Sequence, residues 1–451
     1  MKKCVRKRLL TVLLAGLLLA LPFAGCGDGD FVPVPESSQA EKIPERMPIL
    51  TVWIDNADLW LQNVNTDKLW EEVPGNQREF ILQTEILGNE EPERGNRLSN
   101  LRVELMAGKG PDIFLCSTGG GGSNSFMGYD EEKDAFYSLG RTFPFPEQAM
   151  RNHIFLTLDE YIQKQANRME WEKLDPVIMR AGRTEEGQQL LPMGYSMFIT
   201  LYDRSVYELE QSQLPMTHRE MLDSGNPLLV NTALGTDIWE VCSEPLDYER
   251  DALGFTEEEF LENVMESMDD SSSEDFPEGT YINCWLGQYG EYNMTNKTNG
   301  LGDEAPEYWM VPRYNDAGGI TAEVTSYAAI NRNTSYPEYA FRVLDTLLAK
   351  STQQNSKFYQ AAVEGIPVYM DLGTREEPVV KSGGQWYMGD WNRSQFEFLH
   401  GQINSVHFST PLKEQVSLMW QEYRQNGQTP EGLEKAAKKT YSTMQMMIGE
   451  S

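Results

Sequence analysis

The stretch from residue 80 to residue 118 constrains the fold class most, because it alternates between strand-like and helix-like sequence. Phe80 to Leu87 is an apolar run of the length of a buried strand. From Asn96 to Met106 leucines recur at helical spacing, and the following Gly108-Lys109-Gly110-Pro111 stops a helix. Asp112 to Cys116 is again a compact apolar run. Strand, helix and strand in succession predict an α/β layer with a parallel sheet.

The rest of the chain continues this mixture of strands and helices. Apolar residues make up 40% of the 451-residue sequence and aromatic residues 11%, which is enough to fill the cores of two domains of ordinary size. Folded structure is predicted to begin at Pro48, where a β-branched and aromatic run starts. Further strands are expected over residues 48–54, 189–202, 281–285 and 324–330, and further helices over residues 203–207, 256–268, 337–349 and 432–447.

The amino-terminal segment has the three parts of an export signal. Met1 to Arg8 carries five basic residues, Leu9 to Phe23 is almost wholly apolar, and Ala24-Gly25-Cys26 places two small residues before a cysteine. The apolar run of about 15 residues is shorter than the roughly 20 that span a bilayer. The cysteine makes the segment resemble a bacterial lipoprotein signal, which implies cleavage before Cys26 and lipidation of its thiol. An uncleaved amino-terminal anchor is the alternative.

Residues 1–25 are therefore predicted to be a signal peptide, and residues 26–47 a lipidated cysteine followed by a flexible stalk rich in Pro, Gly, Ser and charge. Either form of the amino terminus would hold the remaining chain outside the cytoplasm, at a membrane. Removing residues 1–25 removes five basic residues and changes the net charge from −31 to −36. Such a field repels nucleic acid and disfavours strongly anionic ligands, so a neutral ligand is expected and a nucleic-acid partner is not.

Metal, cofactor and nucleophile motifs are missing from the sequence. The four histidines have no metal-ligand spacing, and no HExxH, CxxC, GxSxG or phosphate-loop motif occurs. We therefore expect neither a metal nor a cofactor. Beyond Cys26, three cysteines at positions 116, 242 and 284 allow at most one disulfide, and the sequence does not say whether one forms.

Four stretches match a known family in order and spacing. They are Glu104–Ile113 (ELMAGKGPDI), Leu191–Ser196 (LPMGYS) with Leu201–Asp203, Ser326–Asn333 (SYAAINRN) with Tyr336–Ala340, and Asn426–Glu431 (NGQTPE) before a terminal helix. Together they resemble the extracellular solute-binding proteins of ABC importers, family 1, the maltose-binding-protein-like branch. The resemblance covers roughly residues 48–451. Residues 55–77 depart from the family's first helix, and residues 371–400 look like an insertion.

The resemblance implies a periplasmic-binding-protein-like fold of type II, with two α/β lobes joined by crossing hinge strands. Lobe one is expected at 48–198 plus 326–400, and lobe two at 203–320 plus 405–451. It further implies a monomeric, lipid-anchored receptor on the outer face of the bacterial cytoplasmic membrane. Such a receptor is not an enzyme. It captures a solute, here a neutral ligand and by expectation an oligosaccharide, and delivers it to the transmembrane subunits of an ABC permease.

A sugar site needs aromatic faces for the rings and polar side chains for the hydroxyls. The candidate ligand-binding residues, placed by the resemblance and by their positions after predicted strands, are Trp53, Asp55, Asn56, Ser117, Thr118, Tyr195, Ser196, Trp285, Tyr289, Tyr327 and Trp386. Trp285 leads this set, because family members commonly carry a stacking aromatic after the corresponding strand. The competing interpretation of each position is structural: a turn after a strand, or packing in a core.

Two other functions remain open on sequence grounds. A secreted, lipid-anchored glycosidase is compatible with an acidic, aromatic-rich exported chain, and it would need two carboxylates about 5–9.5 Å apart across a cleft. With 69 acidic residues, such a pair can always be nominated. A structural or adhesive surface lipoprotein fits the composition as well, although it leaves the four matched stretches without an explanation.

Overall fold

The chain divides into Met1–Arg46 and a second unit, Met47–Ser451. The computed structural model describes residues 47–55, 66–119, 126–130, 134–164, 167–211, 214, 216–269, 276, 280–286, 295–297, 306–355, 365–381, 384–425 and 428–450. The signal peptide, Cys26 and the stalk up to Arg46 lie outside these residues, so they stay predictions. In the described part, no helix combines the length and the apolar character that crossing a membrane requires.

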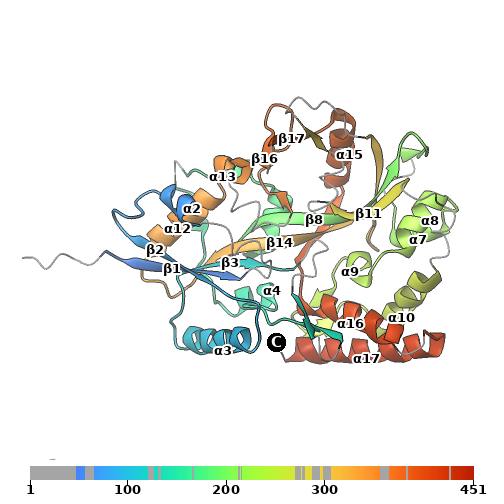
Figure 1. Ribbon diagram of the computed structural model, residues 1–451, viewed down its shortest axis with the longest axis horizontal. Helices are drawn as coiled ribbons and strands as arrows, with labels where there is room; N and C mark the ends of the chain where they lie inside the picture. The colour runs from blue at the N-terminus through green and yellow to red at the C-terminus, as the bar shows by residue number, and fades with distance from the viewer. Residues whose placement is uncertain are drawn as a thin grey trace, which may run out of the picture. The chain divides into compact units, whose positions relative to one another are not determined.

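The first strands form the parallel sheet that the sequence predicts. Strand β1 (Ile49–Asp55) pairs in parallel with both β2 (Ile81–Ile86) and β3 (Ile113–Ser117). Helix α3 (Glu93–Met106) provides the connection from β2 to β3 and buries Leu98 and Leu101. In Figure 1, α3 lies on one side of these strands, while α2 (Asp67–Glu71) and α12 (Pro337–Leu347) lie on the other. Both faces of the sheet are therefore covered, as a parallel sheet requires.

Two long strands extend this sheet into a second group of strands. They are β8 (Leu190–Asp203) and β14 (Ile320–Ile330), and the strand order is β11-β8-β14-β3-β1-β2. The carboxyl-terminal half of β14 pairs antiparallel with β3 and with the start of β8. The amino-terminal half of β14 pairs in parallel with β18 (Ile403–Phe408). Likewise the second half of β8 pairs with β11 (Tyr281–Leu286) and β13 (Tyr308–Pro312).

A separate helical core lies beyond β18. It is made by α9 (Ile238–Val241), α10 (Glu257–Glu266), α16 (Pro411–Gln425) and α17 (Pro430–Gly449), which bury Trp239, Phe260, Leu412, Val416 and Leu433 together. Local sequence fixes where these helices begin. The Thr256 hydroxyl accepts from the backbone N–H of Glu259, whose carboxylate accepts in return from the Thr256 backbone, a capping box. Pro430 occupies the first turn of α17, where its missing N–H costs no hydrogen bond.

Residues 366–400, which include the departure from the family pattern, form a layer over β8 and β13. Strand β15 (Ile366–Pro367) pairs with β8 at Tyr195 and Gly194. Strand β17 (Gly384–Met388) pairs with β16 (Val379–Lys381) and β12 (Thr295–Lys297). Helix α15 (Asp390–His400) follows, and its Trp391 indole donates to the Tyr308 carbonyl of β13 at 2.8 Å. The assignment of residues 326–400 to one lobe stays a prediction.

One predicted helix does not form. Residues 204–206, expected to be helical with their neighbours over 203–207, make a turn after β8 instead. The Asp203 carboxylate accepts from both the backbone N–H and the hydroxyl of Ser205, at 2.8 and 2.6 Å. Such a local bond competes with helical hydrogen bonding. Cys116, Cys242 and Cys284 are all buried and free, so none of the three forms a disulfide.

Shorter elements complete the described chain. They are β4 (Met127–Asp130), β5 (Ala135–Ser138), α4 (Pro146–Arg151), α5 (Asp159–Ile162), α6 (Pro176–Met179), β6 (Arg183–Thr184), β7 (Gly187–Gln188), α7 (His218–Asp223), α8 (Pro227–Leu234), β9 (Leu246–Asp247), β10 (Ala252–Leu253) and α13 (Lys350–Asn355).

Candidate ligand-binding site

Four buried or half-buried ion pairs lie near the middle of β8 and β14. There the two strands leave the group formed with β1, β2 and β3 and join the group formed with β11, β13 and β18. The pairs are Asp55–Arg94, Glu414–Arg141, Glu323–Lys413 and Glu240–Arg313. We call these eight residues the crossing-strand cluster. Each cation is matched by one carboxylate, so the eight side chains together carry no net charge.

The first pair is fixed at the end of β1. The Asp55 carboxylate accepts from Arg94 at 2.7 Å and from the backbone N–H and hydroxyl of Thr142, each at 2.8 Å. Asp55 is buried, and its oxygens are held by donors from helix α3 and from the segment before α4. The Phe126 ring packs against two cations of the cluster, with its centroid 5.5 Å from the Arg94 guanidinium and 4.6 Å from that of Arg141.

The second pair joins chain segments that are far apart in sequence. Arg141 precedes α4, and its guanidinium pairs with Glu414 of α16 and donates to the Ser409 carbonyl at 3.1 Å. The Ser138 hydroxyl donates to the same Glu414 carboxylate at 2.7 Å. Burial lowers the pKa of Arg141 to about 9, although the nearby carboxylates of Asp55 and Glu323 act to raise it. Arg141 and Glu414 thus connect the region after β5 to α16 directly.

The other two ion pairs are linked to each other, because Lys413 contacts the carboxylates of both. Lys413 donates to Glu323 at 2.5 Å and to Glu240 at 3.4 Å, and Arg313 donates to Glu240 at 3.2 Å. Burial of Glu323 would raise its pKa, but the charges of Lys413 and His407 outweigh burial and lower that pKa to about 2. Glu323 therefore stays ionised in the folded protein, and Lys413 remains its counter-charge.

Two aromatic rings, those of Trp285 and Phe198, lie next to Lys413 and Arg313. Trp285 of β11 is half-buried, and its ring packs edge-on against Phe198 of β8 with centroids 4.9 Å apart. The Lys413 ammonium lies 4.1 Å from the Trp285 ring centroid, and the Arg313 guanidinium lies 3.3 Å from that of Phe198. Trp285, the leading candidate from the sequence, therefore contacts the crossing-strand cluster.

Three hydroxyl groups in the middle of the crossing strands are buried without a partner. Ser196 on β8 and Thr325 and Ser326 on β14 have side-chain oxygens that find no hydrogen-bond partner among the described residues. The same holds, within that part of the chain, for Arg141 Nε, Glu323 Oε2 and Arg313 Nε. An unsatisfied buried polar atom costs about 1–3 kcal/mol, so a group of them calls for an explanation such as a bound polar molecule.

The structure brings several other predicted residues next to this cluster. The hydroxyls of Ser117 and Thr118 donate to the carbonyls of Thr325 and Val324, at 3.5 and 2.6 Å. Tyr327 on β14 is buried, and its ring packs edge-on against Phe408. Burial, together with the neighbouring Cys116, raises the pKa of Tyr327 well above its usual value.

The remaining predicted residues fall elsewhere or outside the described chain. Trp53 is buried in the main core, where its indole N–H donates to the Thr142 hydroxyl at 2.9 Å. Tyr195 is the neighbour of Ser196 on β8, so its side chain points to the opposite face of the sheet. Asn56 and Tyr289 lie outside the described residues, and so does the side chain of Trp386 in β17. The ligand roles of all these residues stay predictions.

The cluster also contains residues that the sequence analysis did not single out, namely Arg94, Arg141, Glu240, Arg313, Glu323, Lys413 and Glu414. One of them had a local signal. Glu323 is the one charged residue in the strand Ile320–Ile330. A buried carboxylate needs a partner, so its presence in this strand predicts an ion pair. The described residues hold no group of histidine, cysteine and acidic side chains arranged to bind a metal ion.

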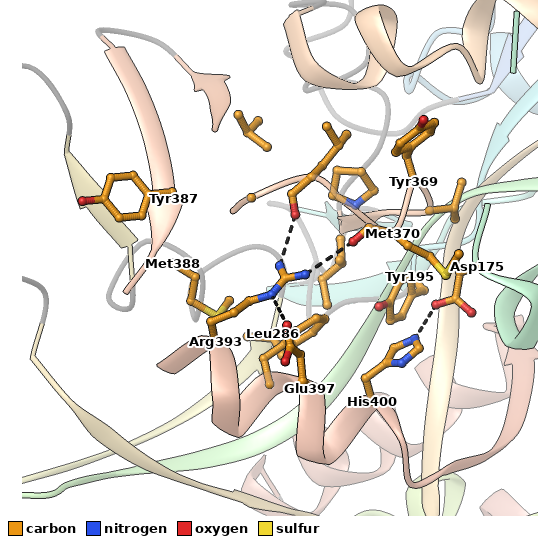
Figure 2. Close-up of a pocket in the computed structure, with 17 residues that line it drawn as sticks. Asp175, Tyr195, Leu286, Tyr369, Met370, Tyr387, Met388, Arg393, Glu397 and His400 are labelled. Atoms are coloured by element: carbon orange, nitrogen blue, oxygen red, sulfur yellow. Dashed lines mark hydrogen bonds and ion pairs between the residues drawn. The ribbon is translucent and has the colours of Figure 1, made fainter. Parts of the chain in front are cut away.

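A pocket of about 220 Å³ opens on the Tyr195 face of β8 (Figure 2). Its walls come from β8, β11, residues 366–373, β16, β17 and α15, and most of the lining side chains are apolar. Figure 2 shows Asp175 and His400 paired beside Tyr195, with Arg393 reaching from α15 toward backbone carbonyls. The pocket and the crossing-strand cluster thus lie on opposite sides of the same strand.

Comparison with solved structures identifies this arrangement. An extracellular solute-binding protein of family 1 from Alicyclobacillus acidocaldarius matches with a TM-score of 0.51 at 12% identity, over 89% of this chain and 98% of that one. A periplasmic oligogalacturonide-binding protein from Yersinia enterocolitica matches with a TM-score of 0.50 at 14% identity, over 89% and 99%. The fold is that of a solute-binding protein. It is a mixed α/β fold of the periplasmic-binding-protein type, as the sequence predicts.

These likenesses speak for the fold alone. A de novo designed cysteine esterase matches equally well, with a TM-score of 0.51 at 13% identity over 90% of this chain and 98% of that one. A scan against protein-family models found no match, and a search of curated proteins found none that is significant. The function must therefore be argued from the site.

Proposed function

We propose that this chain is the lipid-anchored, extracellular solute-binding receptor of an ABC importer. It captures a neutral polar ligand, with an oligosaccharide as the expected class, between two lobes at the crossing-strand cluster. It then presents the closed form to the transmembrane subunits of a permease, acting as a monomer and without catalysis. The observation that carries the proposal is the pair of buried hydroxyls of Ser196 on β8 and Ser326 on β14, which have no partner among the described residues and lie on the face of the charge-compensated cluster.

The electrostatics of the cluster favour a neutral ligand. Its four cations each have a carboxylate partner, and Asp237 adds a further carboxylate near Lys413 and Arg313, so an anionic ligand would enter without a spare cation and would lose its hydration. A sugar hydroxyl both donates and accepts, and can therefore satisfy Ser196 and Ser326 as well as Arg141 Nε and Glu323 Oε2. The half-buried Trp285 ring offers an apolar face for a pyranose ring.

The contacts of Glu414 suggest how the site opens. Its carboxylate pairs with Arg141 and accepts a hydrogen bond from Ser138, and both of these residues follow β4. Glu414 itself belongs to α16. Breaking these contacts would expose the buried polar atoms to water, and remaking them around a ligand would close the site. Hinge closure of this kind is a common response to ligand binding.

A thermal-shift screen of residues 26–451 against a panel of neutral glycans tests the proposal. A ligand at one hundred times its dissociation constant stabilises the folded state by about 2.7 kcal/mol, which gives a measurable rise in Tm. A shift with a neutral oligosaccharide is the expected result. Shifts confined to peptides or polyamines would contradict the carbohydrate assignment, and release of sugar fragments during incubation would favour the glycosidase instead.

The anchor needs its own test, because it depends on residues 1–47 alone. Labelling of the full chain with a radioactive fatty acid in a bacterial host should mark the wild type, and Cys26→Ala should remove the label. Cys4→Ala, which changes the other cysteine of this segment, serves as the matched control and should leave the label in place. A labelled Cys26→Ala chain would contradict lipidation at this position.

A further inference from the structure

We propose that the pocket on the Tyr195 face of β8 is a second ligand site, for a compact, uncharged ring compound of mainly apolar surface. This site is separate from the crossing-strand cluster and does not depend on the proposed function. At about 220 Å³ the pocket exceeds the volume, about 150 Å³, at which an apolar protein cavity binds benzene. It therefore has room for a one-ring or two-ring molecule.

The walls of the pocket supply apolar contact on several sides. Leu286 of β11, Val379 of β16 and Phe396 of α15 are buried and line it, and Tyr195 and Tyr369 add aromatic rings. The Tyr369 hydroxyl already donates to Glu170 at 2.8 Å, so this residue offers the pocket its ring face. Aromatic and aliphatic walls of this kind bind a planar apolar ring best.

The charged groups at the pocket are bound to protein partners, which argues against a charged ligand. Asp175 pairs with His400 and also accepts from the backbone N–H groups of Val177 and Ile178, at 3.0 and 3.4 Å. An anion or cation in the pocket would therefore meet no free counter-charge from Asp175 or His400.

Arg393, a further charged group that lines the pocket, is engaged as well. It donates to Glu397 at 2.9 Å and to the carbonyls of Leu372 and Met370, at 3.2 and 3.4 Å (Figure 2). These bonds hold the guanidinium against the 366–373 segment. They fix the pocket wall and leave apolar surface as the means of recognition.

Indole is a suitable probe, because it is uncharged, planar and small enough for the volume. Titration of the folded chain with indole, followed by ligand-observed NMR, should give saturable binding with a dissociation constant of roughly 0.1–1 mM, as expected for a ligand of so few atoms. Tryptamine and indole-3-acetate carry the same ring with a positive or a negative charge. Each should bind at least about tenfold more weakly, because the described lining residues offer it no free counter-charge.

Two substitutions locate the binding. Met370 is a partly exposed lining residue, 40% exposed, so Met370→Trp should fill the pocket and abolish indole binding. Val379→Phe, from β16, should fill it as well and weaken indole binding. Met446→Trp, at a methionine that is 61% exposed on α17, is the matched control and should bind indole like the wild type. Absence of saturable binding to the wild type, indole binding that survives Met370→Trp, or equal binding of the charged analogues would each overturn the proposal.

Discussion

The two faces of β8 differ in chemistry at the point where the strand passes between the two strand groups. On the Ser196 face, the neighbourhood consists of ion pairs, unpartnered hydroxyls and the half-buried Trp285. On the Tyr195 face, it consists of apolar walls around an open pocket, with the polar groups Asp175 and His400 paired to each other. Because successive strand residues point to opposite faces, a single strand can serve both environments.

This contrast shows that buried polar atoms without a hydrogen-bond partner and an open cavity are separate indications of a binding site. The crossing-strand cluster is filled with side chains but retains buried atoms that lack partners in the described chain. The pocket has volume, and the charged groups named above are bonded to protein partners. The first kind of site selects hydrogen-bonding ligands, and the second selects shape and apolar surface.

The largest effect is expected from breaking an ion pair on the polar face. Arg94→Met leaves the buried Asp55 carboxylate without its counter-charge, which should lower the free energy of unfolding by about 3–5 kcal/mol. Arg97→Met on the same helix removes a solvent-exposed pair with Glu85, and should cost at most about 1 kcal/mol. Urea denaturation measures both. Equal costs would show that the buried pair has no special role.

Neighbouring residues on β11 separate the two faces. Leu286→Ala removes a fully buried side chain on the pocket side and should cost about 2–4 kcal/mol, while the response to a ligand at the crossing-strand cluster persists. Trp285→Ala should cost less stability and abolish that response, measured as the ligand-induced rise in Tm. If Trp285→Ala retained full affinity, Trp285 would be a packing residue rather than part of the site.

The polar face should also show a pH dependence that Glu323 carries. The pKa of Glu323 is about 2 in the folded protein and about 4.3 in an unfolded chain, so the unfolded state takes up the proton first as the pH falls. Its contribution to stability is therefore complete above about pH 4.3 and is lost as the pH falls toward 2. Between pH 5 and pH 2.5 this carboxyl should contribute a loss on the order of 2 kcal/mol to the free energy of unfolding, and Glu323→Gln should remove that contribution. An identical pH profile for Glu323→Gln would contradict this.

The smallest effects are expected from two threonine substitutions that should change the stability in opposite directions. Thr325 has an unpartnered hydroxyl in the described structure, so Thr325→Val should leave the ligand-free protein as stable or more stable by about 1 kcal/mol. The Thr200 hydroxyl donates to Asn283 at 2.6 Å, so Thr200→Val should cost about 1 kcal/mol instead. Thermal unfolding compares the two variants. A loss of stability in both would mean that Thr325 has a partner.

The backbone architecture was largely predictable because its signals are local. A pattern of about a dozen residues or fewer is enough to predict three strands and one helix, at 48–54, 281–285, 324–330 and 337–349. All four elements form. The turn at 204–206 is not predictable from periodicity, because it depends on two hydrogen bonds that Ser205 donates to the Asp203 carboxylate. Positions taken from the family resemblance, such as Asp55, Ser196 and Trp285, lie at or beside the crossing-strand cluster.

The charged partners in that cluster were not predictable in the same way. Arg141 and Glu414 are separated by 273 positions, and Glu323 and Lys413 by 90. Neither member of the first pair stands out from the many charged residues around it in sequence, because ion pairing depends on the tertiary fold. Burial, and not residue type, distinguishes Arg94 from Arg97.

The course of the chain through its crossing strands has a consequence for the order of folding. The first half of β14 has β18 as its neighbour, and β18 lies at 403–408, within the last 50 residues. A chain that emerges from its amino terminus onward cannot complete this part of the sheet until residues 403–408 have been made. Long-range pairing of this kind folds slowly and late. A polypeptide that must cross a membrane before it folds would gain time from such delay.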